Sequence, residues 1–108
     1  MAQDYIVLKE QEDTGMIAIN KSVFESITEI SVQEVDGAIC IPNTRFSKPI
    51  QIKIVKNKLQ VDADIKVRYG SKVNVISEMV QNRIYENIFF MTGYKPSDIT
   101  VNVIGFDI

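Results

Sequence analysis

The residues whose type and spacing come closest to a catalytic arrangement are Asp62 and Asp64, two positions apart in an alternating segment. In an extended strand their side chains point to the same face, about 7 Å apart. Two carboxylates so placed could share acid–base work or bind calcium. Lys66 and Arg68 continue the row, however, and a solvated strand face offers no burial that would separate the carboxylates' affinities for protons. We therefore interpret the row as a solvent-exposed structural face.

Other catalytic chemistry is scarce in the sequence. There is no histidine, the usual general base near neutral pH, and the only cysteine is Cys40. Structural zinc sites take nearly all their ligands from these two residue types. The 5 glycines are scattered, so no phosphate-binding loop is formed. We expect a protein that is not an enzyme and that uses no metal or other cofactor.

Composition places the chain among ordinary globular proteins. Hydrophobic residues make up 45% and charged residues 24% of 108 residues, and the net charge is -2, which disfavours binding to a phosphate backbone. A single cysteine cannot form an intramolecular disulfide, which is typical of a reducing compartment. The sequence shows neither a signal peptide nor the roughly 20 apolar residues that a membrane span needs. We expect a cytoplasmic protein.

Apolar periodicity predicts the element order β-α-β-β-β-α-β. The strands are predicted at residues 16–19, 38–41, 50–55, 59–69 and 99–104, the last extended by Phe106 and Ile108. The first helix is predicted to be capped by Asn20 or Ser22 and to end at Gly37, and the second to run from Asn74 to Gly93. The expected buried stripes are Val23, Phe24, Ile27, Ile30 and Val35 in the first helix, and Val73, Ile76, Val80, Ile84, Ile88 and Met91 in the second.

These elements predict a two-layer α+β sandwich. The alternating strands form a mainly antiparallel or mixed sheet with one apolar face, and the two helices cover that face. We expect a single domain over residues 15–108. Residues 1–14 form an N-terminal arm, which is either an ordered edge strand or a loose segment.

Four aromatic residues cluster late in the second predicted helix and just after it: Tyr85, Phe89, Phe90 and Tyr94. The buried stripe of this helix does not require four aromatic residues at its end. The ordinary interpretation is core packing plus a tyrosine whose hydroxyl reaches water, and the functional one is a patch that binds a partner protein. These residues are our candidate protein-interaction site.

Several segments in order resemble the bacterial alkaline shock, or envelope stress response, family. They are residues 15–24, 34–37, 67–70, 80–84, 91–94 and 99–103. The resemblance implies a non-enzymatic cytoplasmic protein, mainly of Gram-positive bacteria. It also implies self-association and attachment near the membrane through a separate anchor protein. After Gly37 the chain departs from the family pattern, so the resemblance does not identify the particular partner.

The leading functional hypothesis is thus a self-associating scaffold or adaptor of the envelope stress response. A second hypothesis, suggested only by relatives in that family, is a regulator that binds an enzyme of fatty-acid synthesis. A third is an RNA-binding module that uses Lys53, Lys66 and Arg68 on the open sheet face. The acidic balance of the chain and the intervening aspartates oppose the third.

Overall fold

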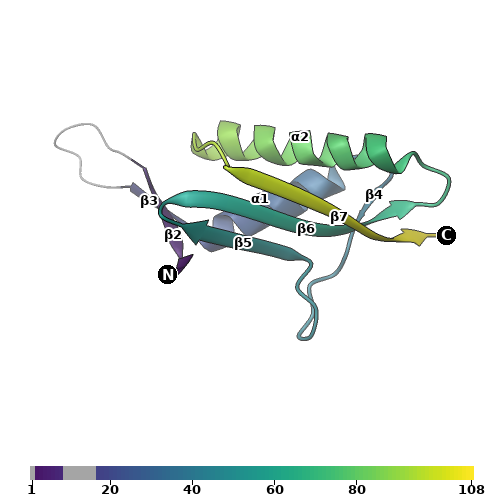
Figure 1. Ribbon diagram of the computed structural model, residues 1–108, viewed down its shortest axis with the longest axis horizontal. Coiled ribbons are helices and arrows are strands. Elements are labelled where there is room, and N and C mark those ends of the chain that lie inside the picture. The colour runs from purple at the N-terminus through teal and green to yellow at the C-terminus, as the bar shows by residue number, and fades with distance from the viewer. Residues whose placement is uncertain (1, 9–16) are drawn as a thin grey trace.

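A computed structural model describes residues 2–8 and 17–108, and the structural statements below concern these residues. Their elements are β1 (Ala2–Gln3), β2 (Tyr5–Leu8), β3 (Ile17–Asn20), α1 (Lys21–Gln33), β4 (Ala38–Cys40), β5 (Ile50–Val55), β6 (Lys58–Arg68), α2 (Val73–Thr92) and β7 (Asp98–Asp107) (Figure 1). From β3 onward the order is β-α-β-β-β-α-β, which confirms the predicted order. Residues 9–14 of the predicted arm, with Gly15 and Met16, lie outside the described residues.

The main sheet is built around β6. Strands β5 and β4 pair antiparallel with successive parts of the same side of β6, and β7 pairs parallel with its other side. Strand β1 pairs antiparallel with β5. The parallel pairing follows from α2, because a crossover helix returns the chain to the end of the sheet at which β6 began. The sheet is therefore mixed, and the predicted fold class is confirmed.

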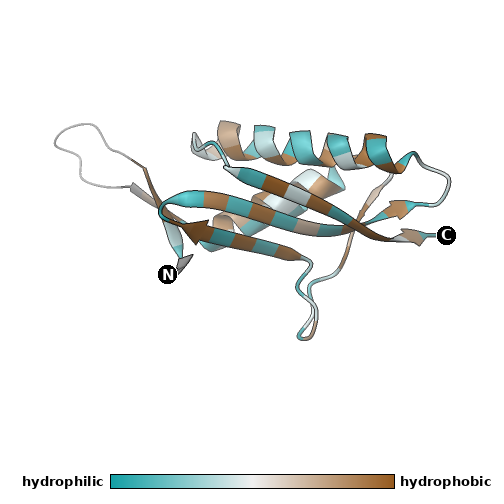
Figure 2. Ribbon diagram, in the orientation of Figure 1, coloured by the Kyte–Doolittle hydropathy of each residue, from teal (hydrophilic) through white to brown (hydrophobic). Residues whose placement is uncertain are grey.

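The core lies between the sheet and the two helices. The odd-numbered residues from Leu59 to Val67 in β6 are all buried, while the residues between them face solvent or are half-buried, which is visible as alternating bands in Figure 2. The same core cluster contains Phe24 of α1 and Val80 and Ile84 of α2. One face of the sheet is thus covered, and the other is polar.

The predicted stripe of the first helix is confirmed for Phe24, Ile27 and Val35, which are buried, and wrong for its other two residues. Val23 and Ile30 are exposed, whereas Thr28 and Ser31 are fully buried. Each buried hydroxyl donates to the carbonyl four residues earlier, at 2.8 Å for Thr28 and 2.7 Å for Ser31, so burial leaves no polar group unsatisfied. The helix ends at Gln33, and Gly37 lies beyond it, in the turn before β4.

The ends of the two helices follow the sequence signals only in part. Asn20 caps α1 by accepting a hydrogen bond from the Ser22 amide at 3.2 Å, so the alternative cap at Ser22 is not used. Helix α2 begins without any side-chain cap, which corrects the expectation for Asn74. Gly93 ends α2 in the left-handed conformation with φ 78°, as predicted.

The predicted stripe of α2 is confirmed in its centre and wrong at its end. Ile76, Val80, Ile84 and Ile88 are buried, but Met91, in the last turn, is exposed. Strand β6 likewise ends at Arg68, so Tyr69 is exposed and contacts the Phe106 ring edge-on, with centroids 6.4 Å apart. Of the predicted extension of the last strand, Phe106 lies in β7, and Ile108 lies beyond it and is exposed.

The N-terminal residues are ordered against the domain. Strands β2 and β3 form a separate antiparallel pair, and Ile6 is buried in the core. Asn57, in the tight turn between β5 and β6, binds the backbone of Val7 twice, accepting from its N–H at 2.8 Å and donating to its carbonyl at 2.9 Å. Of the two alternatives for this segment, an ordered strand therefore holds for Tyr5–Leu8.

Candidate functional site

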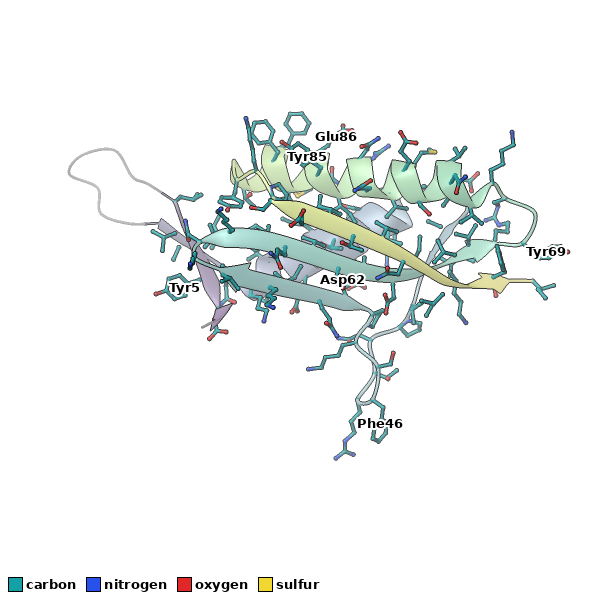
Figure 3. The ribbon with its side chains drawn as sticks, in the orientation of Figure 1. Tyr5, Phe46, Asp62, Tyr69, Tyr85 and Glu86 are labelled. Carbon is teal, nitrogen blue, oxygen red and sulfur yellow. The ribbon has the colours of Figure 1, made fainter. Side chains whose placement is uncertain are left out.

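The C-terminal half of α2 presents exposed aromatic side chains. Tyr85, labelled in Figure 3, is 40% exposed. Phe89 lies one turn further along, on the same side of the helix, and is half-buried. Phe90 is 75% exposed, and its ring centroid lies 5.7 Å from that of Phe89. The ammonium group of Lys95 lies 5.6 Å from the Phe89 centroid, within range of a cation–π contact. We call Tyr85, Phe89 and Phe90 the α2 aromatic surface.

Tyr94, the fourth candidate, has a structural role. It follows the helix cap, packs against the core cluster and donates its hydroxyl to the Asn57 carbonyl at 2.6 Å. A half-buried tyrosine with a satisfied hydroxyl ties the end of α2 to the β5–β6 turn. The structure thus separates Tyr94 from the three residues of the α2 aromatic surface.

A shallow trough that no sequence motif indicates runs between α2 and β7. It consists of two adjoining hollows of about 550 and 400 Å³ that share Gln81, Asn82 and Ile99. The Gln81 side-chain amide donates to the Ile99 carbonyl at 2.9 Å. Tyr85 and Pro96 line one hollow, so the trough adjoins the α2 aromatic surface. The helix side that lines it is polar but almost uncharged, a pattern without a sequence motif.

Asp62 and Asp64 lie on the outer face of β6, where they are joined by a neighbouring strand. The Asn102 side-chain amide of β7 donates to Asp62 at 2.7 Å and to Asp64 at 3.0 Å. One neutral amide therefore bridges both carboxylates and fixes their spacing. Within the described residues no three side chains of the metal-binding types His, Cys, Asp and Glu come together. The arrangement supports the interpretation of a structural strand face.

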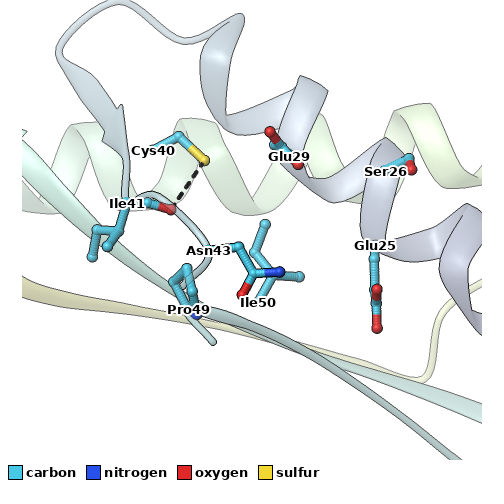
Figure 4. A pocket seen from close by; sticks show the side chains of 8 residues that line it. All are labelled: Glu25, Ser26, Glu29, Cys40, Ile41, Asn43, Pro49 and Ile50. Carbon is cyan, nitrogen blue, oxygen red and sulfur yellow. Dashed lines mark hydrogen bonds between the residues drawn. The ribbon is translucent and has the colours of Figure 1, made fainter. Parts of the chain in front are cut away.

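Cys40 borders a small cavity of about 110 Å³ between α1 and the loop that follows β4 (Figure 4). Glu25 and Glu29 of α1 line its opposite side. Burial, and secondarily the negative charge of Glu29, raise the pKa of the Cys40 thiol above its ordinary value. A thiol that is protonated at neutral pH is a poor nucleophile, which argues against a covalent role for this cavity.

The candidate RNA contacts do not form a continuous basic face. Arg68 is paired with Asp36 at 3.6 Å. Lys53 lines a hollow of about 210 Å³ together with the acidic side chains of Asp62 and Asp98. Carboxylates among the cations would repel a phosphate backbone, so the geometry disfavours the RNA-binding hypothesis.

Nearly the whole chain, residues 9–108, matches a known protein family, described as the alkaline shock protein 23 family with a cell envelope-related function. The chain belongs to the alkaline shock protein 23 family. Membership confirms the resemblance noted in the sequence and gives the chain a cell envelope-related function. No curated protein matches it.

In this member of the alkaline shock protein 23 family, the α2 aromatic surface and the trough both fall inside the matched residues. Among the described residues, no helix combines the length and apolar character needed to cross a membrane.

Proposed function

We propose that this protein is a non-catalytic scaffold or adaptor of the cell envelope stress response. In this proposal it lies in the cytoplasm, associates with further copies of itself and binds a membrane-anchor protein. The family's cell envelope-related function supports the setting. The scarcity of catalytic residue types supports binding over catalysis.

The observation that carries the proposal is the exposure of Phe90 beside Phe89. Full burial of a phenylalanine side chain contributes about 2 kcal/mol, which corresponds to about 30-fold in affinity. Aromatic residues are enriched at the centres of protein interfaces for this reason. Since three neighbouring aromatic side chains on one helix enlarge the apolar area, the α2 aromatic surface suits a protein partner.

The test compares Phe90→Asp with Phe46→Asp. Phe46 is 93% exposed at the tip of the loop between β4 and β5, far from α2 in Figure 3, so it is a matched control for an exposed phenylalanine. Tagged variants are cross-linked in the native cells, membrane and cytosol are separated, and captured proteins are identified. Sedimentation of the purified proteins measures self-association.

We expect the wild type and Phe46→Asp to capture further copies of the chain and a small membrane protein, and Phe90→Asp to lose the small membrane protein. Recovery of a soluble enzyme of fatty-acid synthesis, or of RNA, would instead favour one of the two other hypotheses. A purified protein that stays monomeric and captures no partner would contradict the proposal.

A further inference from the structure

Strand β7 has a free edge. Its 10 residues pair with β6 on one side, and no strand within residues 2–8 and 17–108 pairs with its other side. An open edge of this length is a template for another strand, and proteins commonly shield such edges with charged residues, proline, bulges or covering segments. What shields β7 therefore decides whether it can take a partner.

The backbone groups at this edge can be assigned from one contact. The Ile99 carbonyl accepts a hydrogen bond from Gln81 of α2 and so points away from β6. Backbone groups of successive residues alternate between the two sides of a strand, so the N–H and C=O groups of Val101 and Val103 also face the free edge. Gln81 satisfies only the first of these carbonyls.

The centre of the edge is accessible, and the strand itself is uncharged there, with Glu78 of α2 as the one charged side chain that lines the trough beside it. The trough of about 550 Å³ borders Ile99, Thr100 and Val101, so α2 leaves room beside the strand. No charged residue and no proline occurs from Ile99 to Phe106. The bulge at Ile104 interrupts the register directly after Val103, so the regular part of the edge runs from Ile99 to Val103. This central part lacks the usual protection against strand pairing.

We propose that a second copy of this chain pairs antiparallel along β7, about a two-fold axis at Asn102, so that the two sheets become continuous. This inference rests on the self-association in the proposed function and names its surface. The register follows from Gln81, because its hydrogen bond occupies the Ile99 carbonyl and leaves Val101 and Val103 to form the pairing. Val101 of each copy then lies opposite Val103 of the other. Each such pair exchanges both of its N–H to C=O hydrogen bonds.

Identical strands suit this pairing because the antiparallel two-fold arrangement places the N–H and C=O groups of Val101 in each copy opposite the C=O and N–H groups of Val103 in the other. The charges at the ends are compatible as well. The Asp98 end of one β7 meets an end of the other copy where Gly105 and Asp107 lie beside Lys66 and Arg68 of β6. Arg68 is already paired with Asp36, but Lys66 leaves a positive charge at this end, so the approaching ends do not carry a single sign of charge.

A cysteine series tests the register, in a Cys40→Ser background so that each protein has one thiol. At the axis the two Asn102 residues form a non-hydrogen-bonded pair with Cα atoms about 4.5 Å apart, which a disulfide can span. The two Thr100 residues would be about 14 Å apart, which it cannot span. Thr100→Cys is therefore the matched control on β7, and Gln51→Cys, on the outer face of β5, is the control away from the edge.

We expect Asn102→Cys to form a disulfide-linked dimer under mild oxidation at least about tenfold faster than either control. If the wild type sediments as a dimer or larger species but Asn102→Cys cross-links no faster than Thr100→Cys, edge pairing is refuted while the proposed function stands. If the wild type is monomeric at every concentration, self-association fails and this inference fails with it.

A backbone change provides the second measurement. Val101→Pro removes an N–H that faces the free edge and takes no hydrogen bond from the β6–β7 ladder. Val101→Ala removes side-chain volume but keeps the N–H, so it controls for lost packing. We expect Val101→Pro to weaken dimerisation at least about tenfold more than Val101→Ala, with thermal unfolding verifying that both fold. Equal dimerisation of the two variants would overturn the pairing.

Discussion

Asn57 connects three parts of the fold, and replacing it offers a graded test of how the N-terminal strand is held. Its side chain makes two hydrogen bonds to Val7 of β2. Its backbone has φ 59°, in the left-handed region, and Lys56 before it has φ 52°. Two consecutive positive φ values suit a tight hairpin turn between β5 and β6, in which asparagine is favoured. Each of these contributions can be removed separately.

The expected losses follow from the contacts. Asn57→Asp keeps the acceptor for the Val7 N–H but loses the donor to the Val7 carbonyl, and we expect it to cost about 1 kcal/mol. Asn57→Gly loses both bonds, about 2 kcal/mol, while its easier left-handed geometry and its larger unfolded-state entropy roughly offset each other. Asn57→Ala adds about 1 kcal/mol of backbone strain and is expected to cost about 3 kcal/mol.

Urea and thermal unfolding measure this series, and about 2 kcal/mol corresponds to a fall in Tm of about 10 °C for a domain of this size. Hydrogen exchange at the Val7 amide provides the local readout, since that proton should lose protection in Asn57→Gly and keep it in Asn57→Asp. The reasoning would be refuted if Asn57→Gly matched the wild type in stability, or if Asn57→Ala were no less stable than Asn57→Gly.

Two further predictions concern Cys40 and Gly37. Because the pKa of the Cys40 thiol is raised, we expect alkylation by iodoacetamide to become fast only at a more alkaline pH than for a free cysteine. Glu29→Gln should shift this pH profile of the alkylation rate to lower pH. Unchanged profiles would contradict the assigned causes. The raised pKa also means that folding stability falls as pH rises through the ordinary thiol range towards the folded value, and Cys40→Ser should remove this dependence in pH-dependent urea titrations. Gly37 has φ 93°, and an added Cβ would lie 2.9 Å from the Ile76 side chain. Gly70 has a similar φ of 92°, but the space around it is open, so Gly37→Ala should lower the unfolding free energy more than Gly70→Ala. Equal losses would show that packing against Ile76 contributes nothing.

The fold was predictable where the apolar period was strong. The alternation in β6 and the central stripe of α2 are repeated patterns, and the structure buries the residues that they indicate. The stripe of α1 was predictable only in part, because Thr28 and Ser31 carry polar groups and a sequence pattern treats them as exposed. Their burial depends on hydrogen bonds to their own helix, which tertiary packing allows and composition does not reveal.

The candidate site was predictable as a cluster but not as a surface. Tyr85, Phe89 and Tyr94 are close in sequence, yet Tyr94 turns towards the Asn57 carbonyl, a contact across 37 positions that no local pattern encodes. The trough beside β7 depends on the parallel pairing of β6 and β7, which requires knowledge of the crossover by α2. Sequence patterns within one element cannot supply such non-local relations.

The place of β7 in the chain affects how the protein is made. Strand β6 precedes β7 by the whole length of α2, and parallel pairing across such a crossover is slow because a long loop must close first. During folding, β5 can therefore pair with β6 before β7 docks, while the other side of β6 has no partner. Such an intermediate exposes an apolar strand edge to chaperones and to other chains, so the yield of folded protein should fall as the protein concentration during refolding rises.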